Sequence, residues 1–226
     1  MFSFVIRLWI PDRPGALGLV AAALGRAEAD VVGIEILERG GGNAIDEITV
    51  TIQQATTAGI AKDALIEQLR TVDGVAVEDV RQVGEAHVDT SASALEGAVA
   101  LVECDPADRL PLLCVRLAEL IDGEWTVVIS NDGAEPLAAS GNAPDLAWLA
   151  AFVLGSKHLD GHHDTTPGDM VWARLDRWSA VVVGGRSGRP FHARERQQVS
   201  ALARVVDALA QDGSDVLLAP SGTSRR

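Results

Sequence analysis

The stretch IPDRPGAL at residues 10–17 decides the fold of the N-terminal half, because it joins a β-strand to an amphipathic helix. Residues 2–10 before it are rich in β-branched and aromatic side chains, and their apolar positions alternate, which predicts a strand with one buried face. After it, Leu17, Val20 and Leu24 recur at helical spacing, which predicts a helix. The stretch itself is therefore expected to be a tight corner between the two elements.

The corner has the composition of an anion-binding loop. Pro14 presets a helical φ angle and is expected in the first helical turn, where its missing N–H is not needed. Gly15 has no side chain, so another molecule can approach the backbone closely. The first turn of the helix would then offer unpaired N–H groups and a partial positive charge to a carboxylate. The alternative is an ordinary strand–helix turn in which Asp12 caps the helix.

The elements after this helix complete a βαββαβ order. The sequence predicts two strands, a helix and a last strand, at residues 31–39, 44–53, 59–72 and 75–83. In the second strand, Val32, Ile34 and Ile36 alternate and are expected to point into the core. The order is that of a ferredoxin-like unit, a split pair of βαβ crossovers on an antiparallel sheet.

Residues 1–85 resemble an ACT domain. The motifs that carry the resemblance are D-R-P-G-x-L on the first strand–helix loop and D-G-V before the last strand. The resemblance implies a sensor module that binds a free amino acid and pairs edge to edge with a second copy of itself. It also implies a ligand that lies between the first loop of one subunit and the second-strand region of its partner.

The same resemblance implies roles for individual residues. Asp12 would face the α-amino group of the ligand, Arg13 would face its carboxylate, and Pro14 would fix the loop. Three backbone N–H groups would also face the carboxylate, those of Gly15, Ala16 and Leu17. Contacts from the partner chain would come from the second and third strands, at Gly33, Ile34, Glu35, Asn43 and Asp46.

A second domain is expected at residues 94–212. A linker at 86–93, rich in small residues, precedes it, and a flexible polar tail at 213–226 follows it. Three of its segments resemble the last strand, the following turn and the closing helix of a GAF-like domain, at residues 178–186, 189–191 and 195–207. That resemblance implies either a small ligand held under a loop or a module that only dimerises. The whole chain is thus predicted to be α+β, a ferredoxin-like ACT domain followed by a GAF-like antiparallel sheet with flanking helices.

The composition excludes several classes of function. Of the 226 residues 47% are hydrophobic, which excludes global disorder and is enough for two small cores. The net charge is −13, from 32 acidic against 19 basic side chains, so no nucleic-acid partner is expected. No apolar run reaches the roughly 20 residues that cross a bilayer, and no leader precedes the first strand. A cytoplasmic protein without a membrane partner is therefore expected.

Few residues suggest catalysis or a bound metal. His158, His162 and His163 share one polar loop, a set that could ligate zinc, but such histidines are usually solvated and no metal site is predicted. A thiol reductase of the GAF-like type would need a reactive cysteine. Cys114 lies on an apolar helix stripe and Cys104 precedes an aspartate that disfavours its thiolate, so neither is expected to react.

The sequence therefore favours a non-catalytic regulatory protein, without a cofactor, that binds an amino acid at the interface of a homodimer. The GAF-like domain would relay this signal or sense a second one. Two alternatives remain open. One is a scaffold that only dimerises, and the other is a small-molecule enzyme with a pocket near Trp148, His158 and Trp172.

Overall fold

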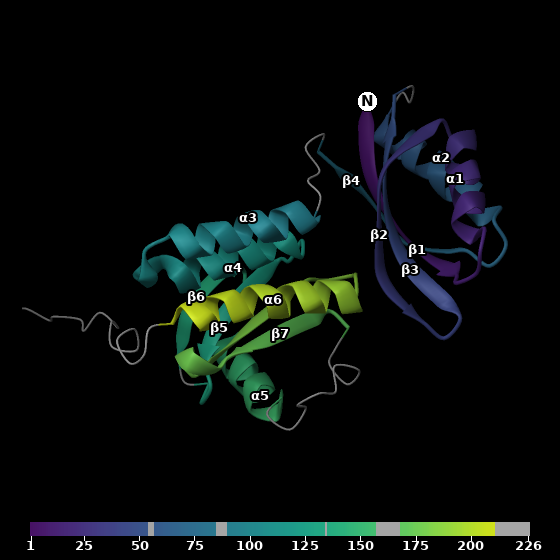
Figure 1. The fold of residues 1–226 in the computed structure, drawn as a ribbon. Coiled ribbons are helices and arrows are strands. Elements are labelled where there is room, and N and C mark those ends of the chain that lie inside the picture. The colour runs from purple at the N-terminus through teal and green to yellow at the C-terminus, as the bar shows by residue number, and fades with distance from the viewer. Residues whose placement is uncertain (54–56, 85–89, 134, 157–167, 211–226) are drawn as a thin grey trace, which may run out of the picture. The chain divides into compact units, whose positions relative to one another are not determined.

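Two antiparallel four-stranded sheets form the framework of the chain, as the computed structural model in Figure 1 shows. The structure describes residues 1–53, 57–84, 90–133, 135–156 and 168–210. Three predicted features lie wholly or partly outside these residues: the linker at 86–93 up to residue 89, the histidine loop at 158–163, and the tail at 213–226. The predicted α+β class is confirmed.

Contacts divide the chain into two units. The first comprises Met1–Asp89 with the short segment His192–Arg194, and the second comprises Thr90–Phe191 with Glu195–Arg226. Each sheet lies within one unit. The two units are therefore described one after the other.

The sheet of the first unit has the strand order β2-β3-β1-β4, and all its pairings are antiparallel. Its elements are β1 (Phe2–Pro11), α1 (Ala16–Arg26), β2 (Ala29–Gly40), β3 (Asn43–Ile52), α2 (Ala58–Arg70) and β4 (Ala76–Val83). Both helices lie on the same face of the sheet (Figure 1). The predicted ferredoxin-like topology is thus confirmed.

The core of the first unit lies between the sheet and its two helices. The central strands β1 and β3 contribute alternate residues to it, and each helix contributes one apolar stripe: Phe4, Ile6, Leu8, Ile48 and Val50 from the strands, and Val20, Leu24, Leu65 and Leu69 from the helices. All of these side chains are almost fully buried. The alternation predicted for residues 2–10 is therefore correct.

The apolar stripe of α1 differs from the predicted one. The buried residues of this helix are Ala16, Val20, Ala23 and Leu24, whereas Leu17 is 37% exposed. The helix begins at Ala16, and the phase set by that start turns Ala16 toward the core and Leu17 away from it.

The prediction that Val32, Ile34 and Ile36 point into the core is wrong. Their exposed fractions are 57%, 45% and 40%. β2 lies at the edge of the sheet and pairs only with β3, so its side chains receive less cover than those of the central strands. Exposure still alternates along the strand, but the less exposed positions are Val31, Gly33, Glu35 and Leu37.

The sheet of the second unit has the strand order β6-β5-β8-β7, again with antiparallel pairings throughout. Its strands are β5 (Trp125–Ser130), β6 (Pro136–Gly141), β7 (Met170–Leu175) and β8 (Ala180–Gly185). Its helices are α3 (Thr90–Glu103), α4 (Arg109–Leu120), α5 (Leu146–Ser156) and α6 (Ala193–Leu209), with short 3₁₀ turns at Pro106–Asp108 and Asp176–Trp178. The last strand and the closing helix predicted at 178–186 and 195–207 are present as β8 and α6.

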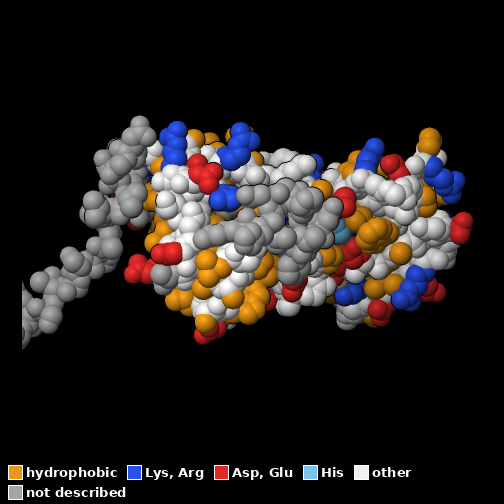
Figure 2. Space-filling model, turned by 90° about the horizontal axis from the view of Figure 1, so that it is seen from below, with side chains coloured by type: hydrophobic (Ala, Val, Ile, Leu, Met, Phe, Trp, Pro, Cys, Tyr) orange, Lys and Arg blue, Asp and Glu red, His pale blue; other side chains and the backbone are white. Residues whose placement is uncertain are grey.

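Helices cover both faces of this second sheet. One face packs on α3, α4 and α6 around residues such as Val128 and Val182, and the other packs on α5 around residues such as Val127 and Val183. The outer side of α5 is apolar as well. It exposes Leu146, Trp148 and Leu154, and Figure 2 shows hydrophobic side chains gathered on the face where α5 lies. The second unit is thus a three-layer arrangement of helices, sheet and helix.

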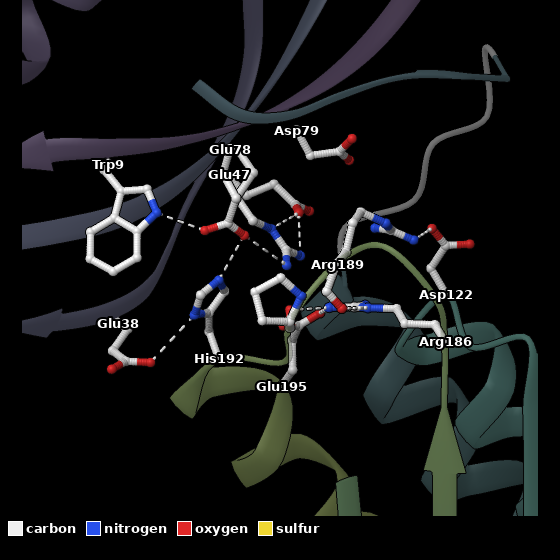
Figure 3. Close-up of polar contacts among 12 residues, drawn as sticks. Trp9, Glu38, Glu47, Glu78, Asp79, Asp122, Arg186, Arg189, His192 and Glu195 are labelled. Atoms are coloured by element: carbon white, nitrogen blue, oxygen red, sulfur yellow. Dashed lines mark hydrogen bonds and ion pairs between the residues drawn. The ribbon is translucent and has the colours of Figure 1, made fainter. Parts of the chain in front are cut away.

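A buried ion cluster links three strands of the first sheet, and Figure 3 labels Glu47, the acid at its centre. Arg7 of β1 donates from Nη2 and Nε to Glu47 Oε2 of β3, at 2.8 Å and 3.1 Å, and Arg81 of β4 donates to both oxygens of Glu47 at 3.3 Å. Burial alone would raise the pKa of Glu47, but Arg81 and Arg7 overcome that effect and lower it. Glu47 is therefore a charged residue held by two cations.

Replacing Glu47 by Gln is expected to destabilise the protein by about 3 kcal/mol, because it removes the nearest counter-charge of the buried Arg7 guanidinium, whose ion pair with Glu78 is longer, at 3.8 Å. Urea denaturation of the full chain measures this. The control is Glu119→Gln, which breaks an exposed ion pair with Arg116 and should cost less than about 1 kcal/mol.

The contribution of Glu47 to stability is also expected to depend on pH. Because folding lowers the pKa of Glu47, this contribution is present above the ordinary glutamate range and is lost as the pH falls through the lowered pKa. Equal effects of both variants at pH 7 would contradict this role.

Candidate ligand-binding site

The corner between β1 and α1 is a type II β-turn. The N–H of Ala16 donates to the carbonyl of Arg13 at 3.2 Å, and Gly15 has φ 87° and ψ −13°, the values of the third residue of that turn. Pro14 occupies the second position, for which its fixed φ is suited. The expectation that Pro14 lies inside the first helical turn is therefore wrong, because α1 begins only at Ala16.

The N-terminus of α1 carries no cap. Gly15 stands at the N-cap position and makes no side-chain hydrogen bond, and the first turn contains no acidic residue. Asp12 therefore does not cap the helix, contrary to the alternative interpretation of the sequence. The N–H of Ala16 is used inside the turn. Among the residues that the structure describes, no acceptor is found for the N–H groups of Leu17 and Gly18, which leaves them for a ligand.

The space around this turn is open. Asp12, Arg13 and Pro14 are exposed. A Cβ atom added at Gly15 would meet no heavy atom within 4 Å. The N–H of Asp12 donates to the carbonyl of Gly42 at 2.9 Å, which ties the loop to the hairpin between β2 and β3. The corner is thus accessible from solvent and fixed on both sides.

Asp46 of β3 is buried beside this corner, with 5% of its surface exposed. It pairs with Leu8 of β1 and Ile36 of β2. Its Oδ1 atom is buried and accepts no hydrogen bond from any residue that the structure describes. Burial raises the pKa of Asp46, the charge of Asp12 raises it further, and Arg39 opposes both. The charge of Asp12 therefore acts on Asp46 within one chain.

The remaining predicted site residues separate into two groups. Asn43 is exposed and pairs with Pro11 at the end of β1, next to the corner. The other three lie on the edge strand β2 and pair with a part of β3 beyond Asp46: Gly33 with Thr49, Ile34 with Ile48, and Glu35 with Glu47. The corner thus brings together the loop, Asn43 and Asp46.

Sequence reasoning missed two contributors to this corner, Gly18 and Arg39. Gly18 supplies an N–H group only because the helix starts where the type II turn ends. Arg39 acts on Asp46 from the neighbouring strand, a relation set by the β2–β3 register. A signal for Asp46 was present, since a lone acidic residue shares its alternation with Ile48, Val50 and Ile52. An acid at an inward position of a strand is unusual and marks a special role.

The second unit offers little reactive chemistry in its described part. Cys114 is fully buried, and burial raises the pKa of its thiol to about 11. Trp172 is buried in the core against α5, whereas Trp148 stacks on Phe152 at the surface, with ring centroids 6.1 Å apart. Within the described ranges, no group of three His, Cys, Asp or Glu side chains is placed to hold a metal ion. None of the helices in these ranges could span a membrane.

No protein-family model matches the chain, and no curated protein matches it. Similar solved structures include the ACT domain of a GTP pyrophosphokinase from Chlorobium tepidum, with 17% identity and a TM-score of 0.28 over 36% of this chain and 97% of that one. They also include the regulatory subunit of aspartate kinase from Thermus thermophilus, with 22% identity and a TM-score of 0.29 over 45% and 70%. An unknown protein from Galdieria sulphuraria matches 92% of both chains, with 15% identity and a TM-score of 0.31. The fold of the first unit is established by its own strand order.

Gly15→Ala and Gly18→Ala are expected to change stability in opposite directions. Both positions have open space around the added Cβ, so only the backbone conformation distinguishes them. At Gly15 an alanine must adopt a positive φ, which costs about 1–2 kcal/mol. At Gly18, inside α1, an alanine stabilises the helix by about 0.5–1 kcal/mol. Urea denaturation measures both, and a stabilising Gly15→Ala variant would contradict the left-handed turn.

Proposed function

We propose that this chain is a non-catalytic regulatory protein that binds a free amino acid at the corner between β1 and α1. One observation carries the proposal: the N-terminus of α1 is open and uncapped, and the carboxylates of Asp12 and Asp46 lie beside it. An open helix N-terminus attracts an anion, and neighbouring carboxylates attract a cation. A free amino acid carries both charges on adjacent atoms and is small enough for such a corner.

In this binding mode, the ligand carboxylate accepts hydrogen bonds from the N–H groups of Leu17 and Gly18. The exposed guanidinium of Arg13 adds a positive charge on the same side of the loop. The α-ammonium group of the ligand lies against Asp12. Gly15 leaves room for the ligand because no side chain projects from the turn.

We also propose that the protein forms a homodimer through the edge strand β2. This strand pairs on one side only, with β3, and an unpaired strand edge is a template for a second copy. Val32, Ile34 and Ile36 are exposed apolar residues on the same strand, and charged residues that would protect an edge are absent from these three positions. Association would bring Gly33 and Glu35 of the partner toward the corner.

A ligand held by two chains favours one dimer arrangement over another, which is the basis of regulation in this proposal. We propose that the second unit, which the sequence likens to a GAF-like domain, relays this change or senses a second signal. We place the protein in the cytoplasm, because both of its cysteines are free thiols. Catalysis by Cys114 is disfavoured, because its buried thiol stays protonated at neutral pH.

Isothermal titration calorimetry against the twenty amino acids tests ligand binding. At least one of them is expected to bind the wild-type protein, and Asp12→Ala should weaken its affinity about tenfold or more through the loss of a charged hydrogen-bond acceptor. Asp63→Ala is the matched control, since Asp63 is an exposed aspartate on α2, away from the corner. If no amino acid binds, the scaffold interpretation replaces the sensor.

Sedimentation velocity tests self-association through β2. Ile34→Lys places a charge on the strand edge and is expected to convert a wild-type dimer into a monomer. Ile60→Lys is the control, because Ile60 is equally an exposed isoleucine but lies on α2. A dimer that survives Ile34→Lys would mean that the chain associates through another surface.

A further inference from the structure

We infer that Asp46 binds the ligand in the same chain as Asp12, so that the two carboxylates together hold one primary ammonium group. The inference deepens the proposed function and rests on it. It assigns Asp46 to the loop of its own chain, and it restricts the ligand to molecules that carry a carboxylate and a primary ammonium group close together.

Asp46 has a buried carboxylate oxygen without a hydrogen-bond donor among the described residues. A buried carboxylate oxygen without a donor destabilises a folded protein, because the atom has lost its water and gained nothing in exchange. Oδ1 of Asp46 is such an atom within the described residues. Leu8 and Ile36, its strand neighbours, are apolar and cannot compensate it. The fold alone therefore gives no reason for an acid at this position, and a donor from a ligand does.

Asp46 lies on the inner side of the corner between β1 and α1. It pairs with Leu8, whose side chain belongs to the core below α1, so Asp46 lies on the helix-covered side of the sheet. Asp12 follows four residues after Leu8, and the N–H of Asp12 is tied to Gly42, four residues before Asp46. Asp46 is thus enclosed on the inner side of the corner, while Asp12 is exposed on its outer side.

The charges around Asp46 favour an ammonium group as its partner. The charges that act on Asp46 are Arg39 of β2, which favours its ionised form, and Asp12 of the loop, which opposes it; the exposed guanidinium of Arg13 lies on the same loop as Asp12. Arg39 acts on Asp46 through its charge, but Oδ1 of Asp46 has no hydrogen-bond donor among the described residues, so this oxygen remains for another donor. An ammonium group supplies up to three donors and a positive charge, which matches two carboxylates. A hydroxyl group supplies one donor and no charge.

Asp46→Asn tests the inference in two independent measurements. Without ligand, the variant is expected to melt about 2–4 °C higher than the wild type at pH 7.5, because it removes an unpaired buried charge. With the amino acid that binds best, its affinity should fall about tenfold to a hundredfold. The 2-hydroxy acid with the same side chain should not bind the wild type. Asp30→Asn, an exposed aspartate on β2, should change neither measurement.

The pH dependence gives a further readout. Wild-type affinity should rise with pH while Asp46 loses its proton, and Asp46→Asn should flatten this rise, since Asp12 is then the only acid left at the corner. An Asp46→Asn variant that binds the amino acid as tightly as the wild type would overturn the inference and leave the proposed function intact. So would a lower melting temperature, which would make Asp46 a structural residue.

Magnesium and calcium chloride, titrated alone, separate an ammonium site from a metal site. Neither should produce heat that depends on Asp46. If a divalent cation binds through Asp46 and no amino acid binds, both the inference and the proposed function fail. If amino acids bind and the 2-hydroxy acid binds equally well, the ammonium group contributes nothing to affinity, so both the inference and the ammonium-binding role proposed for Asp12 fail.

Discussion

The left-handed backbone at Gly15 is the constraint on which the first unit depends. At φ 87° the chain turns from β1 into α1 within a type II turn, and that turn fixes the residue at which the helix starts. The start sets the phase of the helix, which turns Ala16, Val20 and Leu24 toward the sheet. It also leaves the helix without a capping side chain. One dihedral angle thus determines both the packing of α1 and the open N–H groups at its end.

Glu47 and Asp46 are neighbouring acids on β3 and both are buried, but their pKa values shift in opposite directions. Glu47 lies opposite Arg7 and is bound by two guanidinium groups, so its pKa is lowered. Asp46, one residue earlier, lies on the other face among apolar neighbours, and its pKa is raised. The first acid strengthens the pairing of three strands. The second has a buried oxygen for which no hydrogen-bond donor is found among the described residues.

The sequence patterns predicted the elements well where the pattern is local. The alternation of residues 2–10, the D-R-P-G turn and the βαββαβ order all depend on neighbours within one or two turns of chain. The predictions failed where tertiary context decides. Ile34 and Ile36 alternate like buried residues, but their strand lies at the sheet edge. For the candidate site, the loop residues were identified from the sequence. The resemblance placed Asp46 across an interface, whereas the register pairs it with Leu8 of β1, four residues before Asp12 in the same chain.

The central position of β1 has a consequence for how the chain folds during synthesis. β1 is synthesised before both of its neighbours in the sheet, β3 and β4. The charged residues that join the three strands are Arg7, Glu47 and Arg81. Until residue 81 has left the ribosome, the charge set is incomplete and the first strand has a free side. Long-range pairing of this kind closes late and all at once. Until β4 has been synthesised, a nascent chain of this protein therefore lacks one of the two strand neighbours of β1 and one of the two cations that bind Glu47.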